Sequence, residues 1–131
     1  METAKILIVD DDRDMTSSLK AVLEGRRFCV VTACDRREGM EALRSESPDL
    51  VILDVMMDTW QDGFEMAREI KNDAKFGDVL ILMLTGVKDK SGIDFKTSAG
   101  DPAWLPVDAF LDKPVGGDVL VAEVERLLAG T

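Results

Sequence analysis

Aspartate, threonine and lysine side chains follow four of the apolar segments of this 131-residue sequence, and they are residue types that can carry phosphoryl chemistry. The set comprises Asp10, Asp11, Asp54, Thr85 and Lys113. Carboxylates packed together repel one another, and a hard divalent cation such as Mg²⁺ removes that penalty because it prefers oxygen ligands. A carboxylate can also become an aspartyl-phosphate, while a lysine and a hydroxyl offset charge on the phosphoryl oxygens. The set therefore predicts phosphoryl transfer at a metal-binding acidic cluster.

Short segments rich in apolar and β-branched residues are predicted to be the strands that position these side chains. They are Lys5–Val9, Phe28–Thr32, Leu50–Leu53, Val79–Leu84 and Ala109–Leu111. Continuous apolar runs of this kind are typical of strands buried on both faces of a sheet. Helical patterns alternate with them, which indicates a parallel sheet with helices on both faces. Because ligands bind beyond the carboxyl ends of such strands, the polar groups are expected to converge at one edge.

The helical patterns carry their own end signals. The first has an apolar stripe and is predicted to stop at Gly25. Asp35 and Glu38 have the spacing of an N-cap and its N3 partner, so they are expected to open the second helix. The third helix is expected after a turn-rich loop that reaches Gly63, and the last from about Asp118.

Length and composition favour one acidic domain. A chain of 131 residues with 46% apolar residues suits a single core, and the net charge of −10 disfavours direct binding to nucleic acid. No apolar run approaches a membrane span, and the first residues do not resemble a secretory signal. Cys29 and Cys34 occur without any histidine, so we expect reduced residues in or beside a strand rather than a zinc site. A cytoplasmic location is expected.

Four segments resemble the sequence blocks of response-regulator receiver domains, in the same order and at the same spacing. They are Ile6–Asp12, Pro48–Asp54, Leu82–Gly86 and Phe110–Pro114. The resemblance runs from about Lys5 to Leu128 and implies a single receiver domain over residues 1–131. The fold that it implies is CheY-like, that is flavodoxin-like: a doubly wound, five-stranded parallel sheet in the order 2-1-3-4-5 with helices on both faces.

The resemblance also implies a metal-binding acceptor site. Asp10 and Asp11 correspond to the acidic pair, with Asp11 the more direct ligand of Mg²⁺. Asp54 corresponds to the phospho-acceptor, and the backbone carbonyl of Met56 would complete the protein's share of the metal ligands. Asp12 is expected to face solvent or to cap the first helix.

Three further roles follow from the same resemblance. Thr85 is the expected switch hydroxyl, and Phe110 is the aromatic residue whose rotamer would follow it. Lys113 would contact the phosphoryl group, and its bond to Pro114 is expected to be cis.

The sequence departs from the family pattern in two places. The segment 57–63 lacks the usual proline after the acceptor and has one extra residue, so Trp60 is expected to lie over the site. The segment 86–107, with three glycines and two prolines, is longer than usual and shows no helical stripe. The fourth helix is therefore expected to be short, displaced or absent, which affects partner recognition more than chemistry.

The leading interpretation is a phosphorelay switch rather than an enzyme. A sensor histidine kinase or a phosphotransfer protein would phosphorylate Asp54, and the domain would then change its affinity for an output protein or form a homodimer. One alternative is a haloacid-dehalogenase-like phosphatase, in which Asp10 would be the nucleophile and Asp12 its partner. The other is a receiver-like binding module that is never phosphorylated. The sequence leaves open whether the domain stands alone or belongs to a longer protein.

Overall fold

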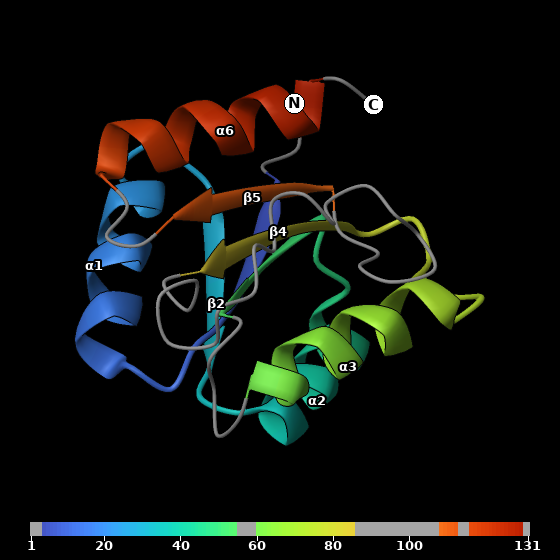
Figure 1. Cartoon of the computed structure of the whole chain (residues 1–131). Coiled ribbons are helices and arrows are strands. Elements are labelled where there is room, and N and C mark those ends of the chain that lie inside the picture. Colours follow the sequence, from blue (N-terminus) through green and yellow to red (C-terminus); the bar gives the residue numbers. More distant parts are fainter. Residues whose placement is uncertain (1–3, 55–59, 86–107, 113–115, 130–131) are drawn as a thin grey trace.

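The structure is a computed structural model that describes residues 4–54, 60–85, 108–112 and 116–129, with the side chains of residues 60–64, 85, 110 and 112 left aside. Strands and helices alternate along the chain (Figure 1). The elements are β1 (Lys5–Val9), α1 (Arg13–Glu24), β2 (Cys29–Ala33), α2 (Arg36–Glu46), β3 (Leu50–Asp54), α3 (Trp60–Asn72), β4 (Leu80–Thr85), β5 (Ala109–Asp112) and α6 (Gly117–Ala129). Each strand begins and ends within one residue of its predicted bounds.

The strands form one parallel sheet in the order β2-β1-β3-β4-β5, the order that the family resemblance implied. In its register, Val9 of β1 pairs with Ala33 of β2 and with Leu53 of β3. The residues that follow these partners therefore emerge side by side at the carboxyl edge. Asp54 pairs in turn with Leu84 of β4, so the same edge continues toward β5.

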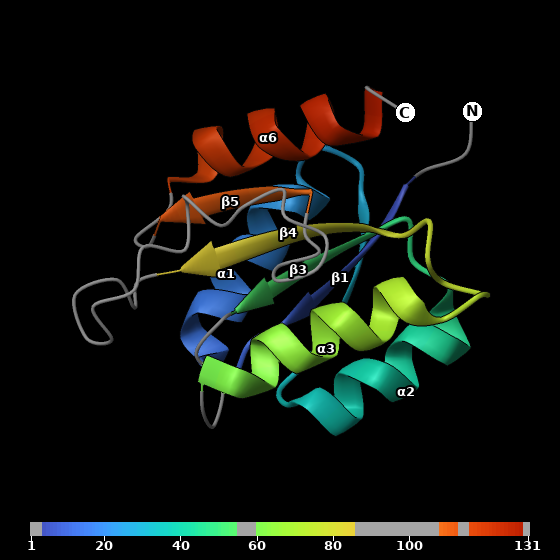
Figure 2. The same cartoon turned by 45° about the vertical axis from the view of Figure 1, so that its right-hand side comes forward.

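Helices cover both faces of the sheet, with α1 and α6 on one side and α2 and α3 on the other (Figure 2). Side chains of β1 alternate between the two resulting cores. Leu7 and Val9 belong to the core under α2 and α3, whereas Ile6 and Ile8 belong to the core under α1 and α6. All four are fully buried, which explains why this strand reads as an uninterrupted apolar run.

The ends of the first two helices follow capping rules, with one difference. Asp35 caps α2 by accepting a hydrogen bond from the N–H of Glu38 at 2.8 Å, so the predicted opening of this helix is confirmed. Gly25 is the C-cap of α1, but it is right-handed, with φ −63°. The left-handed residue after α1 is Arg27, with φ 71°. The predicted helix end is confirmed, while the left-handed conformation lies two residues later.

The third helix begins earlier than the sequence suggested. The prediction of a loop that reaches Gly63 is wrong, because α3 already begins at Trp60 and includes Gly63. A single glycine costs a helix only about 1 kcal/mol, so α3 can include Gly63. The predicted irregular segment 86–107, and with it the fourth helix, lies outside the described residues.

Polar contacts hold the opposite, amino-terminal edge of the sheet. The N–H of Lys5 donates to Asp49 Oδ2 at 2.8 Å, and the N–H of Asp49 donates to the carbonyl of Lys5 at 2.8 Å. Asp108, just before β5, accepts from the N–H of Ile81 at 2.8 Å and from Lys71 Nζ at 3.0 Å. No helix in the described part of the chain has both the length and the apolar character needed to cross a membrane.

Candidate functional site

The side chains of Asp10, Asp11 and Asp54 form a compact acidic cluster at the carboxyl edge of the sheet. One carboxylate oxygen from each lies within 4.8 Å of the other two. Asp10 follows β1 directly and Asp54 ends the neighbouring β3, and each is only 2% exposed, whereas Asp11 is exposed. The structure thus brings together the three carboxylates that the sequence predicted to converge.

Backbone contacts fix Asp10 where the chain turns from β1 into α1. Its N–H donates to the carbonyl of Ala33 at 3.1 Å, and its Oδ1 accepts from the N–H of Asp12 at 2.9 Å. The hydroxyl of Thr16 donates to the carbonyl of Asp12 at 2.8 Å and lies 3.4 Å from that of Asp10. Asp12 itself caps α1 by accepting from the N–H of Met15 at 3.1 Å, so its expected capping role is confirmed.

The donor set of the cluster fits a hard divalent cation. At an effective dielectric constant near 20, two like charges at this spacing repel by roughly 3 kcal/mol, and burial of Asp10 and Asp54 removes water that would screen them. All three donors are carboxylate oxygens, the ligand type that Mg²⁺ and Ca²⁺ prefer. The exposed carboxylate of Asp11 leaves one side of the cluster accessible from solvent.

The other predicted site residues are only partly described. The backbone of Thr85 ends β4 and pairs with Asp112, and that of Phe110 pairs with Met83. Thr85 therefore lies on the strand beside β3 and Phe110 on the next strand, β5, but their side chains are outside the described atoms. Four further predictions fall outside them too: the Met56 carbonyl, Lys113, its bond to Pro114, and the Trp60 side chain. These roles stay predictions.

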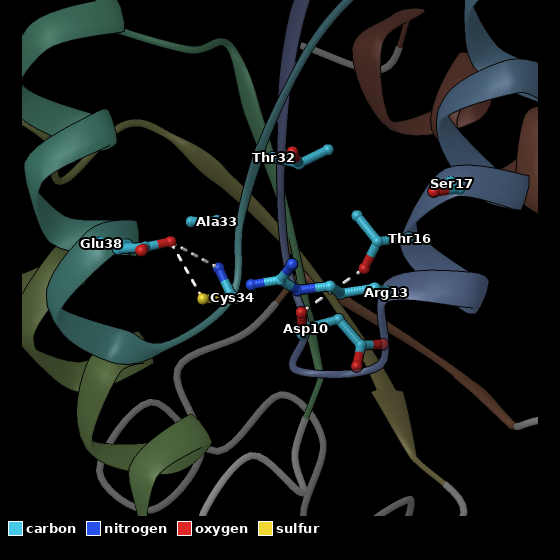
Figure 3. A pocket seen from close by; sticks show the side chains of 8 residues that line it. All are labelled: Asp10, Arg13, Thr16, Ser17, Thr32, Ala33, Cys34 and Glu38. Carbon is cyan, nitrogen blue, oxygen red and sulfur yellow. Dashed lines mark hydrogen bonds between the residues drawn. The ribbon is translucent and has the colours of Figure 1, made fainter.

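A pocket of about 310 Å³ opens beside Asp10, between the start of α1 and the end of β2 (Figure 3). The residues that line it are Asp10, Arg13, Thr16, Ser17, Thr32, Ala33, Cys34 and Glu38. Sequence reasoning missed this pocket, because its walls come from separate elements. The one signal was Thr16, four residues after the Asp12 cap, at the spacing of a hydroxyl that back-bonds within a helix.

Glu38 ties the end of β2 to the start of α2. One of its oxygens, Oε1, accepts from the N–H of Cys34 at 3.0 Å and from its Sγ at 3.1 Å. The hydrogen bond to Glu38 raises the pKa of the Cys34 thiol, and the backbone N–H of Cys34 lowers the pKa of Glu38. Cys34 and the exposed Cys29 are both free thiols beside and within β2, as expected. A second group of possible ligand atoms within 4.8 Å of one another comes from Cys34, Asp35 and Glu38. Its carboxylates already accept backbone hydrogen bonds, that of Asp35 from Glu38 and that of Glu38 from Cys34.

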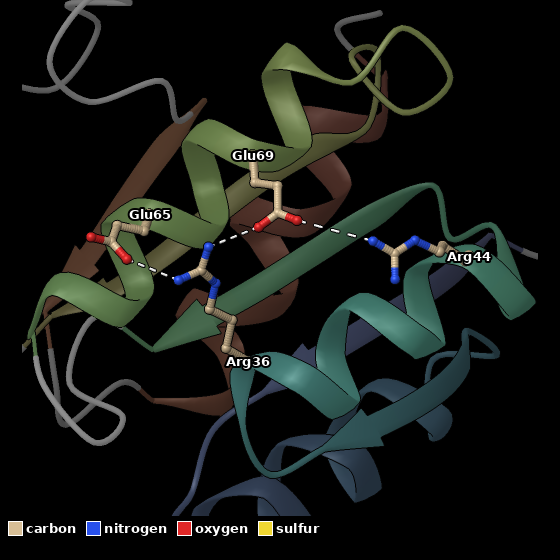
Figure 4. A network of polar contacts seen from close by, with 4 residues as sticks. All are labelled: Arg36, Arg44, Glu65 and Glu69. Carbon is tan, nitrogen blue, oxygen red and sulfur yellow. Dashed lines mark hydrogen bonds and ion pairs between the residues drawn. The ribbon is translucent and has the colours of Figure 1, made fainter.

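A charged network joins α2 to α3 (Figure 4). Arg36 donates to Glu65 and to Glu69, each at 2.8 Å, and Arg44 lies 4.0 Å from the second oxygen of Glu69. The hydrogen bond to Glu69 is the largest of the contacts that raise the pKa of Arg36. The network holds α3, the helix that follows β3, against α2.

Curated proteins that resemble this chain include response regulators and a hybrid kinase. The response regulator MprA of Mycolicibacterium vanbaalenii is 35% identical over 127 residues, which cover 97% of this chain and 51% of that protein. The hybrid signal transduction histidine kinase D of Dictyostelium discoideum is 32% identical over 94% of this chain and 7% of its own length. The chain thus spans about half the length of such response regulators and a small part of the kinase.

Solved structures show the same architecture. A response regulator from Chloroflexus aurantiacus superposes with a TM-score of 0.83 at 29% identity, covering 98% of this chain and 99% of that one. The chemotaxis response regulator CheY4 of Vibrio cholerae superposes with a TM-score of 0.82 at 26% identity, covering 96% of this chain and 99% of that one. These matches agree with the five-stranded order described above.

The sequence also matches the family of response regulator receiver domains over residues 6–125. That match takes in β1 through most of α6, including the strands that place the acidic cluster. The chain belongs to the response regulator receiver domain family of two-component signalling.

Proposed function

We propose that this receiver domain is a phosphorelay switch in which Asp54 accepts a phosphoryl group in the presence of Mg²⁺. The observation that carries the proposal is the cluster of Asp10, Asp11 and Asp54, whose oxygens lie within 4.8 Å of one another. Two of the three carboxylates are 2% exposed, and a close group of carboxylate oxygens is the kind of site that a hard divalent cation binds. The donor would be the phosphohistidine of a sensor kinase or of a phosphotransfer protein.

The transfer makes one bond and breaks another. An oxygen of Asp54 attacks the phosphorus, so a new O–P bond forms while the P–N bond of the phosphohistidine breaks. The electron pair of that bond stays on the imidazole nitrogen, which then takes a proton. Mg²⁺ held by Asp10, Asp11, Asp54 and the Met56 carbonyl would neutralise charge on the carboxylates and the phosphoryl oxygens.

Three further residues complete the proposal. Lys113 would contact the phosphoryl oxygens with its ammonium group, and Thr85 would donate its hydroxyl to one of them. Phe110 would change rotamer as Thr85 moves. The change would spread to a distant surface as a shift between two conformations that bind an output protein differently. We expect the domain to act in the cytoplasm and to form a homodimer when phosphorylated.

Intact-mass analysis after incubation with acetyl phosphate and Mg²⁺ tests this function. We expect one added phosphoryl group on the wild type, none after chelation of the metal, and none on Asp54→Asn. Beryllofluoride with Mg²⁺ should attach to Asp54 and shift the quaternary state measured by light scattering. Absence of labelling on the wild type would instead support a receiver-like module that is never phosphorylated. Attachment to Asp10 would support the phosphatase alternative.

A further inference from the structure

Arg13 is the single cationic side chain among the described residues that line the pocket beside Asp10. It is the first residue of α1, and its side chain extends across the pocket toward Cys34 (Figure 3). Among the described residues the guanidinium has no ion-pair partner, although the side chain is exposed. Within the described part of the chain its charge is therefore offset by longer-range interactions, such as that with Glu38, rather than by an ion pair.

The charge of Arg13 acts across the pocket. The pKa of Glu38 is lowered first by the N–H of Cys34, and Arg13 adds to that lowering. The pKa of Cys34 is raised first by its hydrogen bond to Glu38, and Arg13 opposes that rise. Glu38 and Cys34 lie on the wall of the pocket opposite α1. The electrostatic effect of Arg13 therefore extends across the cavity, which Asp10 also lines.

A cation in this place has opposite effects on the two species that the acidic cluster must receive. It repels a divalent cation, and it attracts the dianionic phosphoryl group of a donor. Asp12 and Asp14 flank Arg13 in the sequence and partly offset its charge, although Asp12 is engaged as the cap of α1. Solvent screens the remaining charge of the exposed Arg13 side chain, so its effects on Mg²⁺ and on phosphoryl donors should be modest and sensitive to salt.

We propose that Arg13, in the pocket that Asp10 also lines, is a positioning residue that weakens Mg²⁺ binding at the acidic cluster while drawing anionic phosphoryl donors toward it. This role rests on the proposed phosphorylation of Asp54. With acetyl phosphate as donor, an Asp54 oxygen forms the new O–P bond, and the P–O bond to the acetyl group breaks. Acetate leaves with that electron pair, so no further reactant is required.

Two measurements on the same variants test the role. Mg²⁺ affinity is measured by titration calorimetry, and the initial rate of Asp54 labelling by acetyl phosphate is measured at saturating Mg²⁺ for each variant. Arg13→Gln removes the charge but keeps a polar side chain, and Arg13→Lys restores the charge. Arg26→Gln is the matched control, because it removes the same charge from an exposed side chain beyond the other end of α1.

Arg13→Gln is expected to bind Mg²⁺ about threefold to tenfold more tightly and to be labelled more slowly by a similar factor, with both effects shrinking at high salt. Arg13→Lys and Arg26→Gln should both resemble the wild type. A purely structural role would weaken both steps together and would not be restored by lysine. Changes in Arg13→Gln no larger than in Arg26→Gln would overturn the inference and leave the proposed function intact. A wild type that neither binds Mg²⁺ nor takes label would overturn the proposed function itself.

Discussion

Carboxylate oxygens of Asp10 and Asp54 lie within 4.8 Å of each other, although the two residues come from neighbouring parallel strands. Both side chains are almost fully buried. The pairing of Val9 with Leu53 places the two aspartates side by side, one residue further along β1 and β3. Parallel pairing therefore brings two negative charges together at a depth where water screens them poorly. The stability of the metal-free domain should reflect that repulsion.

Asp54→Asn should make the metal-free domain more stable, even though we expect it to abolish labelling. Removing one of two buried like charges should raise the free energy of unfolding by roughly 1 to 3 kcal/mol in the presence of a chelator. Added Mg²⁺ should stabilise the wild type more than the variant, since metal that binds only the folded state adds about 2.7 kcal/mol at 100 times Kd.

Urea denaturation with chelator and with Mg²⁺ measures both effects. Asp78→Asn is the control, because Asp78 is exposed in the turn before β4, away from the cluster. A variant that is less stable than the wild type in chelator would argue against electrostatic strain in the cluster.

Glu38→Ala should make the Cys34 thiol more reactive. Loss of the hydrogen bond to Glu38 lets the pKa of Cys34 fall toward its ordinary value, so alkylation at mildly alkaline pH should become faster. Site-resolved mass spectrometry of iodoacetamide adducts checks this, with the exposed Cys29 as internal control.

The same pair predicts a pH dependence of stability. Because the folded-state pKa of Cys34 is raised, the unfolded chain loses this proton first, and stability falls as pH rises above about 9, the ordinary value for the thiol. That part of the decline should be smaller in Glu38→Ala. Equal slopes in the two proteins would show that the Cys34–Glu38 contact does not persist in solution.

The ion-pair network between α2 and α3 should make a small but measurable contribution to the free energy of unfolding. Its side chains are about a third to a half exposed, so Arg36→Gln should lower the free energy of unfolding by about 0.5 to 1 kcal/mol at low salt, and by less at high salt. Arg37→Gln, on the same helix with a side chain 80% exposed, is the control and should change stability less. A salt-independent loss in Arg36→Gln would point to packing rather than charge.

Two glycines should respond in opposite directions to alanine. A Cβ on Gly39 would lie 2.7 Å from Met66 Cε and 3.0 Å from Val9 Cγ2. The methionine tip can move, but the branched Val9 side chain is fully buried on β1, so Gly39→Ala should cost about 1 to 3 kcal/mol. Gly25 has φ −63°, and a Cβ there would make only ordinary contacts, at 3.4 Å, with the carbonyl oxygens of Ala21 and Val22, so Gly25→Ala should gain about 0.4 to 1 kcal/mol. Thermal melts of both variants decide the comparison.

Much of the fold could be predicted from the sequence because burial on both faces leaves a clear pattern. Strand β1 was predicted with its observed bounds, since an interior strand carries no polar alternation to obscure them. The start of α3 was missed because Gly63 looks like a turn residue, whereas a helix tolerates one glycine. Likewise Gly25 marked a helix end, while the left-handed conformation falls on Arg27.

The acidic cluster was predictable because parallel strands deliver their carboxyl ends to one edge. The pocket beside Asp10 and the charged network between α2 and α3 could not be predicted from the sequence. Each depends on long side chains from elements that only the folded chain brings together. The roles of Thr85, Lys113 and Phe110 rest on family resemblance.

The alternation of β1 side chains between two cores also restricts how this protein can vary in length. Inserting or deleting one residue within β1 would exchange the side chains of Leu7 and Ile8 between the cores and would turn Asp10 away from Asp54. Changes in length are thus tolerated only in the connections between strands. Both departures from the family pattern, in segments 57–63 and 86–107, lie after the strands rather than within them. Insertions in these connections can change the surface of the domain while Asp10 and Asp54 stay in register.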